Sequence, residues 1–404
     1  MLTLFENIAQ LVQVRPVETK LLRGEQMNSL PVIENAFLLI DDGIIRDFGP
    51  MGEKPAIRPD RRIDASGRLV LPAWTDSHTH TVFSASRYTE FMDKIRGLSY
   101  EEIAARGGGI LQSAKRLNQT SEDELLEGAL ARVHEMMRYG TAALEIKSGY
   151  GLSVEGELKM LRVVRRLKKL LPIPVKATFL GAHAVPQGMQ REDYVRIIVD
   201  EMLPEVARHH LADYVDVFCE KGYFTPDDTA RILDAAARFG LRPKLHVNQF
   251  TSCGCLQTAV RYGALSVDHL EEMRPEDFAA LSGGQTIATA LPGCSFFLGI
   301  PYAPVKKMIE HNIPVALATD FNPGSAPSFN MNFMVALACI KARLTPEQAI
   351  NAATLNAAAA LELSGEMGSI ARGKKARLVL TRPLNHYGEI PYYFATNPVE
   401  ELFV

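Results

Sequence analysis

Between residues 69 and 324 the sequence alternates apolar runs, rich in β-branched residues, with stretches of helical character. Eight strand–helix units over this length predict a closed (β/α)8 barrel of parallel strands, an α/β fold. A doubly wound sheet is the alternative, but it would need fewer strands and usually has a Gly-rich first turn, where this chain has histidines instead. The expected strands lie at 69–80, 140–151, 175–186, 214–224, 243–250, 265–272, 286–294 and 313–324.

Several of the segments between these runs carry signals for helix starts. Ser121 and Glu124 have the spacing of a capping box, in which each residue binds a backbone amide at the start of a helix. Thr-Pro pairs at 225–226 and 345–346 predict two further starts, because proline suits the first helical position. The glycines at 107–109 lack the spacing of a phosphate-binding motif and predict a mobile loop.

Both ends of the chain have strand-and-turn character. Two apolar runs flank Asp42-Gly43, a pair typical of a hairpin turn, and strand character returns after residue 361. We therefore expect 1–67 and 361–404 to form one small β domain beside a barrel domain of residues 68–360.

Composition excludes several classes of protein. The chain has 44 basic and 47 acidic residues, so no basic excess is present to neutralise nucleic acid. No apolar run reaches the ~18 residues of a membrane span. The start, MLTLFENIAQL, lacks the basic region of a signal peptide. The five cysteines are odd in number and lack framework spacing, which favours reduced thiols in a cytoplasmic protein.

Half of the ten histidines fall at the carboxyl ends of expected strands, where barrel enzymes carry their catalytic groups. The other five lie on helices or connections, which favours surface or capping roles for them. The histidines at strand ends are His78, His80, His183, His246 and His269.

Four of the residues at strand ends predict a metal site. His78 and His80 are two apart, so both side chains point to the same face of the first strand. His246 ends the fifth strand and Asp320 the eighth. Three imidazoles and a carboxylate leave one position for water and suit zinc, iron and manganese alike. Taken singly, they could be exposed loop histidines, a buried core histidine and a turn cap.

Other polar residues near the expected barrel mouth are candidates for proton transfer or substrate binding. His183 and His269 could move protons or polarise a carbonyl, or could instead support a metal ligand. Arg87, in the loop after the first strand, could hold a substrate carboxylate through two parallel hydrogen bonds, or could pair with Glu90. Tyr150 offers a hydroxyl.

The turn after Asp320 is the last candidate. Asn322-Pro-Gly324-Ser325 could direct backbone amides and an amide side chain toward an anion, although such a sequence by itself indicates only a turn.

The motifs resemble those of a known enzyme family. PAWTDSHTH, the fifth-strand histidine, DHL and TD are similar to the amidohydrolase superfamily. EIKSGYGL, FLGAHAVP, DVFCE, DHLEE and TDFNPGS, spread over nearly the whole chain, resemble its imidazolonepropionase family. The resemblance implies a distorted (β/α)8 barrel with a small β-sandwich made from both chain ends. It also implies a homodimer that hydrolyses 4-imidazolone-5-propanoate to N-formimidoyl-L-glutamate, the third step of histidine degradation.

The same resemblance implies a site. One zinc or iron ion would be held by His78, His80, His246 and Asp320. Binuclear branches of the superfamily use a carbamylated lysine on a middle strand, but Lys221 lies beyond the expected strand end, which favours a single metal. The implied substrate contacts are Arg87, Tyr150, His183, Gln249, Asn322, Gly324 and Ser325.

Roles for these residues follow as hypotheses. Asp320 would take the proton of the attacking water and pass it to the departing ring nitrogen. His269 would orient or polarise the substrate. Some relatives have Glu where this chain has Gln249, and an amide cannot act as a base, although it can hydrogen-bond a ring nitrogen. The alternatives are another single-metal cyclic amidase, a nucleobase deaminase, or an inactive metal-binding barrel.

Overall fold

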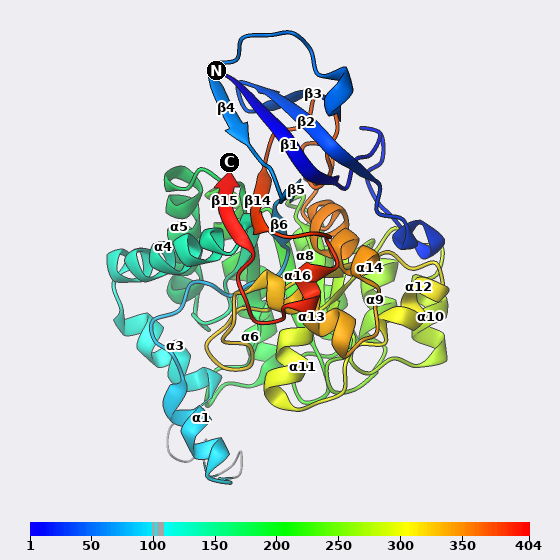
Figure 1. The fold of residues 1–404 in the computed structure, drawn as a ribbon. Coiled ribbons are helices and arrows are strands. Elements are labelled where there is room, and N and C mark those ends of the chain that lie inside the picture. The colour runs from blue at the N-terminus through cyan, green and yellow to red at the C-terminus, as the bar shows by residue number, and fades with distance from the viewer. Residues whose placement is uncertain (99–101, 103–108) are drawn as a thin grey trace.

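The protein is a nearly closed parallel barrel with a separate mixed sheet beside it (Figure 1). The computed structural model describes residues 1–98, 102 and 109–404, so Gly107 and Gly108 of the predicted mobile loop lie outside the described residues. The barrel strands are β6 (Trp74–Asp76), β7 (Thr141–Lys147), β8 (Val175–Ala182), β9 (Tyr214–Cys219), β10 (Arg242–Val247), β11 (Ser266–His269), β12 (Ile287–Ala290) and β13 (Val315–Leu317).

Neighbouring barrel strands pair in chain order from β6 to β13, and the predicted α/β barrel is confirmed. Two backbone hydrogen bonds bring its first and last strands together. The amide of Asp320 donates to the His78 carbonyl at 3.0 Å, and the amide of His80 donates to the Phe321 carbonyl at 2.9 Å. The closure therefore places the His78–His80 pair directly beside Asp320.

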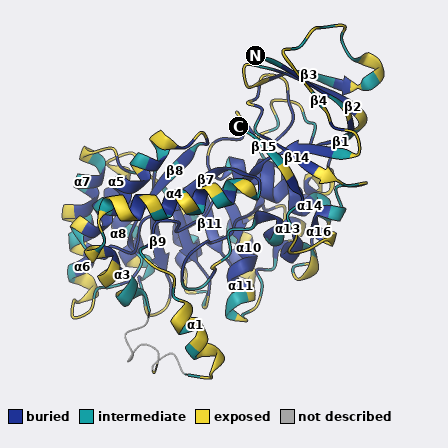
Figure 2. Cartoon of the chain, turned by 60° about the vertical axis from the view of Figure 1, so that its left-hand side comes forward, coloured by how far each residue is buried: buried dark blue, intermediate teal, exposed yellow. Residues whose placement is uncertain are grey.

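Helices cover the outside of the barrel, and their exposed residues lie on the outer faces while the strands within are buried (Figure 2). The predicted starts are confirmed, because Ser121, Thr225 and Thr345 cap α4, α8 and α14. Within the described residues the α-helices are α1 (Tyr88–Ile95), α3 (Ile110–Gln119), α4 (Glu122–Arg138), α5 (Val154–Leu170), α6 (Arg191–Ile197), α7 (Leu203–Arg208), α8 (Pro226–Ala237), α9 (Cys255–Arg261), α10 (Pro275–Leu281), α11 (Pro292–Leu298), α12 (Val305–Glu310), α13 (Met331–Ile340), α14 (Pro346–Asn351), α15 (Ala357–Ala359) and α16 (Glu389–Tyr392). Short 3-10 or π-helical turns are η1 (Gly24–Asn28), η2 (Met51–Glu53), η3 (Ile198–Met202) and η4 (Ala352–Asn356).

The second sheet joins the two ends of the chain, as expected. Its order is β15-β14-β5-β1-β2-β3, with β4 paired to β1. The predicted hairpin is formed by β2 and β3, and its turn residues Asp42 and Gly43 have φ values of 46° and 76°. The strands are β1 (Leu2–Val12), β2 (Val32–Asp41), β3 (Ile44–Pro50), β4 (Arg61–Asp64), β5 (Arg68–Pro72), β14 (Leu378–Pro383) and β15 (Val399–Phe403).

The predicted first barrel strand, 69–80, is wrong in its extent. Residues Arg68–Pro72 form β5 of the second sheet, and only Trp74–Asp76 form β6 of the barrel. Ala73 between them donates to the Arg377 carbonyl, whereas Trp74 donates to the Gly140 carbonyl. Both strands are buried, so one continuous apolar run does not show where the chain changes sheets.

The expectation of five reduced cysteines is also wrong. Cys219 ends β9 and Cys255 begins α9 after β10, and the two form a disulfide across these adjacent strands. The 36 residues between them hide this proximity in the sequence. Cys253, Cys294 and Cys339 are free thiols. Among the described helices, none is long and apolar enough to cross a membrane.

Candidate metal centre and substrate pocket

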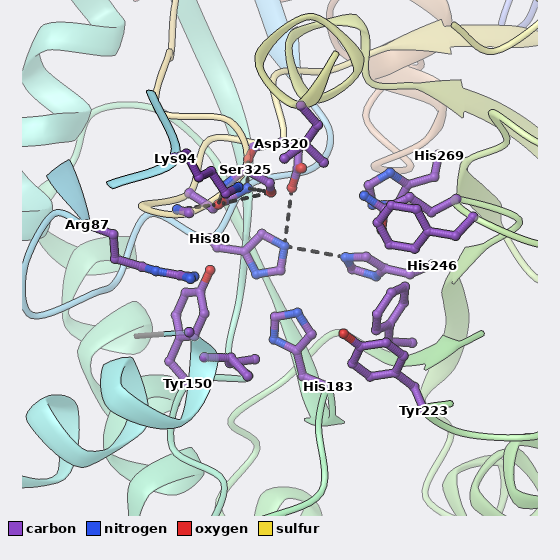
Figure 3. A pocket seen from close by; sticks show the side chains of 18 residues that line it. His80, Arg87, Lys94, Tyr150, His183, Tyr223, His246, His269, Asp320 and Ser325 are labelled. Atoms are coloured by element: carbon purple, nitrogen blue, oxygen red, sulfur yellow. Dashed lines mark hydrogen bonds and ion pairs between the residues drawn. The ribbon is translucent and has the colours of Figure 1, made fainter. Parts of the chain in front are cut away.

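The structure brings the four predicted metal ligands together at the carboxyl end of the barrel. His78, His80, His246 and Asp320 are all buried. Asp320 Oδ1 lies 3.4 Å from His78 Nε2 and 3.5 Å from His80 Nε2, and the Nε2 atoms of His80 and His246 are 3.4 Å apart. Figure 3 shows His80 between Asp320 and His246. The donor atoms of His78, His80 and Asp320 lie close enough to hold one ion.

Two further carboxylates fix the orientation of the imidazoles. Asp268 Oδ2 lies 2.6 Å from His78 Nδ1, and Asp216 Oδ2 lies 2.9 Å from His246 Nδ1. With the proton of each ring on Nδ1, facing a carboxylate, each Nε2 carries a lone pair. His78 Nε2 is buried and has no hydrogen-bond partner in the described chain. Buried lone pairs that converge on a carboxylate are the donor set that a transition metal ion requires, so these residues fit a metal.

Electrostatics favours the metal-binding protonation states of three of these residues, Asp320, His80 and His246. Burial would raise the pKa of Asp320, but the adjacent imidazoles of His78 and His80 hold it well below the usual range. Burial lowers the pKa of His246 far below its usual value, and that of His80 also falls through burial. The Asp320 anion and the neutral imidazoles of His80 and His246 can therefore bind a metal without first losing protons. Burial and the Lys147 ammonium lower the pKa of His78, but the carboxylates of Asp268 and Asp320 raise it to about 9, so this imidazole must lose a proton when the metal binds.

The backbone is strained at the strand ends that carry the site. Asn248, His269 and Asp320 have φ values of 56°, 86° and 55°, a left-handed conformation that costs non-glycine residues on the order of 1–3 kcal/mol. These residues follow or end β10, β11 and β13. The sharp turns direct the side chains of His269 and Asp320 into the barrel mouth.

The metal site forms one end of a pocket of about 200 Å³. Apart from buried His78, every predicted site residue lines this pocket (Figure 3). Lys94, Phe218 and Tyr223 line it too and were not predicted. Lys94 on α1 and Tyr223 in the turn after β9 belong to no motif, and Phe218 lies within DVFCE on β9 but is apolar and gives no chemical signal. The predicted residues in the lining are His80, Arg87, Tyr150, His183, His246, Gln249, His269, Asp320, Asn322, Gly324 and Ser325.

Arg87 forms the predicted ion pair with Glu90 and also lines the pocket. Its Nε and Nη2 bind the Glu90 carboxylate at 2.8 and 2.5 Å, and the same side chain lines the pocket, pointing toward Tyr150 (Figure 3). The guanidinium passes very close to Gly324, where an added Cβ would lie 2.3 Å from Arg87 Nη1. The ion pair with Glu90 and the missing side chain of Gly324 together set the position of the cation.

Gly324→Ala tests this close approach. The glycine does not need a left-handed backbone, so alanine introduces only the clash with Arg87 Nη1. The cation must move, and displacement of a binding group by about an ångström can cost up to ~100-fold in rate. We expect kcat/KM to fall at least tenfold on that scale, with metal content unchanged. Steady-state kinetics and elemental analysis measure both, and normal kinetics would show that Arg87 is not held by this contact.

Glu157 builds the loop that presents Tyr150, and sequence analysis missed it. This buried carboxylate accepts hydrogen bonds from the backbone amides of Gly149, Gly151 and Leu152, at 2.8, 2.7 and 2.9 Å. The only signal in the sequence is an acidic residue in the first turn of α5. Burial raises the pKa of Tyr150, so its hydroxyl stays protonated and can donate.

His183 is held as a neutral imidazole. Its Nδ1 lies 3.0 Å from the Gly149 carbonyl oxygen, which can only accept, so the proton sits on Nδ1. Burial and the neighbouring His80 lower the pKa of His183 to about 3. At neutral pH its Nε2 is therefore a hydrogen-bond acceptor, which does not suit the polarisation of a carbonyl.

His269 and Gln249 occupy the side of the pocket near β10 and β11. His269 Nδ1 lies 3.5 Å from the buried carboxylate of Glu271, and its ring centre is 5.3 Å from that of His246. Gln249 Nε2 contacts the buried thiol of Cys294 at 3.4 Å.

The turn after Asp320 differs from its expected role. The backbone amides of Gly324 and Ser325 donate to Asn322 Oδ1 at 2.8 and 2.7 Å, and Asn322 Nδ2 donates to the Asp320 carbonyl at 2.7 Å. The expectation that these amides face an anion is wrong, because the short side chain of Asn322 folds back and binds them. The turn instead fixes the backbone beside Asp320.

Comparisons with known proteins identify the family of this chain and proteins with the same fold. A family model described as "Amidohydrolase family" matches residues 69–402. An imidazolonepropionase of Flavobacterium johnsoniae is 56% identical over 406 residues, covering 100% of this chain and 99% of its own. Among solved structures, a guanine deaminase of E. coli aligns at 16% identity with a TM-score of 0.74, covering 100% of this chain and 97% of that one. An adenosine deaminase from Xanthomonas campestris with bound zinc aligns at 16% identity and a TM-score of 0.69, covering 100% and 91%. At such identity the two structures show the fold alone.

Proposed function

Because the chain belongs to the imidazolonepropionase family of amidohydrolases, we propose that its barrel pocket is where 4-imidazolone-5-propanoate is hydrolysed. The enzyme acts in histidine degradation. Water adds to the ring carbonyl carbon, the bond from that carbon to the ring nitrogen breaks, and the nitrogen gains a proton. The product is N-formimidoyl-L-glutamate, in which the former ring carbonyl is a carboxylate.

One zinc or iron ion would be held by His78, His80, His246 and Asp320. When bound, the metal supplies Lewis acidity, which makes water a nucleophile at neutral pH. A single ion is favoured because Lys221, the lysine considered as a bridge between two metals, is exposed in the turn after β9.

The two ends of the pocket suit the two ends of the substrate. The propionate carries the negative charge and would bind Arg87, with the protonated hydroxyl of Tyr150 as a second donor. The ring would then extend toward Asp320. The proposal rests on one observation: the Arg87 cation and the cluster of candidate metal ligands line the same pocket.

Neutral groups would orient the ring between these ends. His183 Nε2 would accept a hydrogen bond from a ring N–H, since its Nδ1 faces the Gly149 carbonyl. The Gln249 amide would bind the ring as donor or acceptor. His269, held near Glu271, would orient the ring carbonyl.

Asp320 would carry the proton. Its carboxylate stays ionised because His78 and His80 lower its pKa, so it can accept the proton of the attacking water. The same oxygen would return this proton to the departing ring nitrogen, which completes the hydrolysis without a second acid.

A comparison of substrates tests the proposal. The purified protein is incubated in ¹⁸O-labelled water with 4-imidazolone-5-propanoate, guanine or cytosine. We expect turnover of the first compound only, with one ¹⁸O atom in the new carboxylate. Faster deamination of guanine or cytosine would assign the pocket to a nucleobase deaminase instead.

Gln249→Glu tests whether the amide has an indispensable role. If Gln249 only forms a hydrogen bond to the ring, the carboxylate can replace it as an acceptor. We expect the variant to keep substantial activity, with a shifted pH profile because a new titrating group faces the substrate. Initial rates across pH measure this, and a variant inactive at every pH would show that the amide donor is required.

Assembly and location complete the proposal. The family resemblance supports a homodimer. A cytoplasmic location remains the proposal, although the Cys219–Cys255 disulfide removes the cysteine argument for it. Size-exclusion chromatography with light scattering gives the mass of the assembly in solution. A mass equal to one chain at the working concentration would contradict the dimer.

A further inference from the structure

A buried lysine lies beneath the metal site, and the reaction proposed above does not use it. Lys147 ends β7, and its side chain is 0% exposed. Its ammonium group lies 2.7 Å from Glu145 Oε1, 2.8 Å from Asp216 Oδ2 and 3.7 Å from Asp268 Oδ2. All three carboxylates are buried, so this ammonium supplies positive charge where water cannot reach.

Two of these carboxylates are the ones that orient the metal histidines. The oxygen of Asp216 nearest to Lys147 is also the one that binds His246 Nδ1, at 2.9 Å. The oxygen of Asp268 nearest to Lys147 is likewise the one that binds His78 Nδ1, at 2.6 Å. One ammonium group therefore lies beside both of the carboxylate oxygens that bind the two imidazoles.

Barrel geometry explains how one residue reaches both. β7, β9 and β11 are alternate strands of the barrel, and alternate strands contribute side chains to a common layer of its core. Lys147, Asp216 and Asp268 meet in such a layer, directly below the ring of ligands. The remaining oxygens of the aspartates are also bound, by the His246 amide and the Ser266 hydroxyl.

We propose that Lys147 is a positioning residue for the metal: by fixing Asp216 and Asp268 together, it holds His246 and His78 with their Nε2 lone pairs toward the ion. This inference rests on the proposed metal site. Without the ammonium, two buried carboxylates lose their shared counter-charge and separate, and both imidazoles lose their fixed orientation.

The sign of the effect separates positioning from simple electrostatics. Removing a cation beside a metal site should tighten metal binding if charge alone matters, since like charges repel. Loss of positioning should weaken binding instead, and groups that orient ligands typically contribute roughly 10- to 100-fold to metal affinity. For Lys147→Met we therefore expect the zinc Kd to rise roughly 10- to 100-fold.

The matched control is another buried lysine. Lys374 is 1% exposed and binds the carbonyls of Ser364 and Met367 and the hydroxyl of Ser369, away from the pocket. Lys374→Met removes an equally buried ammonium, so it reports the general cost to the fold. Its zinc Kd should equal that of the unmodified protein.

The measurement is competition for zinc against a chromophoric chelator, on protein whose folding is checked by thermal denaturation. The absorption spectrum of the cobalt-loaded protein should also change in Lys147→Met and not in Lys374→Met. If Lys147→Met does not fold, Lys147→Gln keeps a donor but no charge, and its Kd should rise less in the same direction.

An unchanged or lower Kd in a folded Lys147 variant would overturn the positioning role. If the unmodified protein itself bound no zinc, the metal proposal would fail before this one. The two failures are therefore distinguishable.

Discussion

Asp320→Asn should abolish ring opening. Asn has nearly the same shape but cannot accept the proton of the attacking water, and general acid–base groups contribute roughly 10²- to 10⁴-fold in rate. The variant also removes the negative charge that lies 3.4 and 3.5 Å from the Nε2 atoms of His78 and His80. We therefore expect both kcat and bound metal to fall. Activity assays at saturating substrate and elemental analysis measure the two effects.

A surface carboxylate provides the control. Asp193 on α6 is half-exposed and pairs with Arg196, so Asp193→Asn makes the same chemical change away from the pocket. Its activity and metal content should match those of the unmodified protein. Full metal content and normal turnover in Asp320→Asn would refute the assignment of this residue as ligand and proton carrier.

The second large effect is expected for Arg87→Met. Loss of a charge-assisted contact to a partner that stays buried costs on the order of 2–5 kcal/mol. This corresponds to a fall in kcat/KM of roughly 30- to 5000-fold. Metal content should not change, because Arg87 is not one of the residues that would hold the ion and its side chain points toward Tyr150 (Figure 3). Arg87→Lys should recover only part of the loss, since lysine lacks the planar fork.

The ion pair with Glu90 makes a second variant informative. Glu90→Gln keeps the cation but removes the carboxylate that anchors its Nε and Nη2 atoms. We expect a smaller rise in KM than for Arg87→Met. Near-normal kinetics in Arg87→Met would mean that the propionate binds elsewhere, and the substrate assignment would lose its main physical support.

Much of the barrel could be predicted because its strands are buried on both faces. Continuous apolar runs that end in His or Asp mark the carboxyl ends of parallel strands, and those ends meet at one mouth. That reasoning is sufficient to bring His246 and Asp320 together, although they are far apart in the chain. The same reasoning fails at residues 69–80, because a strand is buried and apolar in either sheet and the sequence does not show where the chain passes from one sheet to the other.

The support beneath the site could not be predicted from the sequence. Lys147 stands at the end of an apolar run, and nothing local indicates that it contacts Asp216 and Asp268, which lie on other strands. The residues of the turn at Asn322 are typical of an anion-binding turn, but in the folded chain the backbone amides of Gly324 and Ser325 are already bound to the Asn322 side chain. The Cys219–Cys255 disulfide likewise depends on which strands are adjacent.

The central claim is that one metal ion, held by the four residues at the barrel mouth, drives ring opening. The most direct test removes all metal with a chelator and then titrates zinc or iron back while following conversion of 4-imidazolone-5-propanoate. We predict no turnover in the stripped protein and a linear rise that stops at one ion per chain. Full turnover in the stripped protein, or a rise that continues to two ions per chain, would contradict this account.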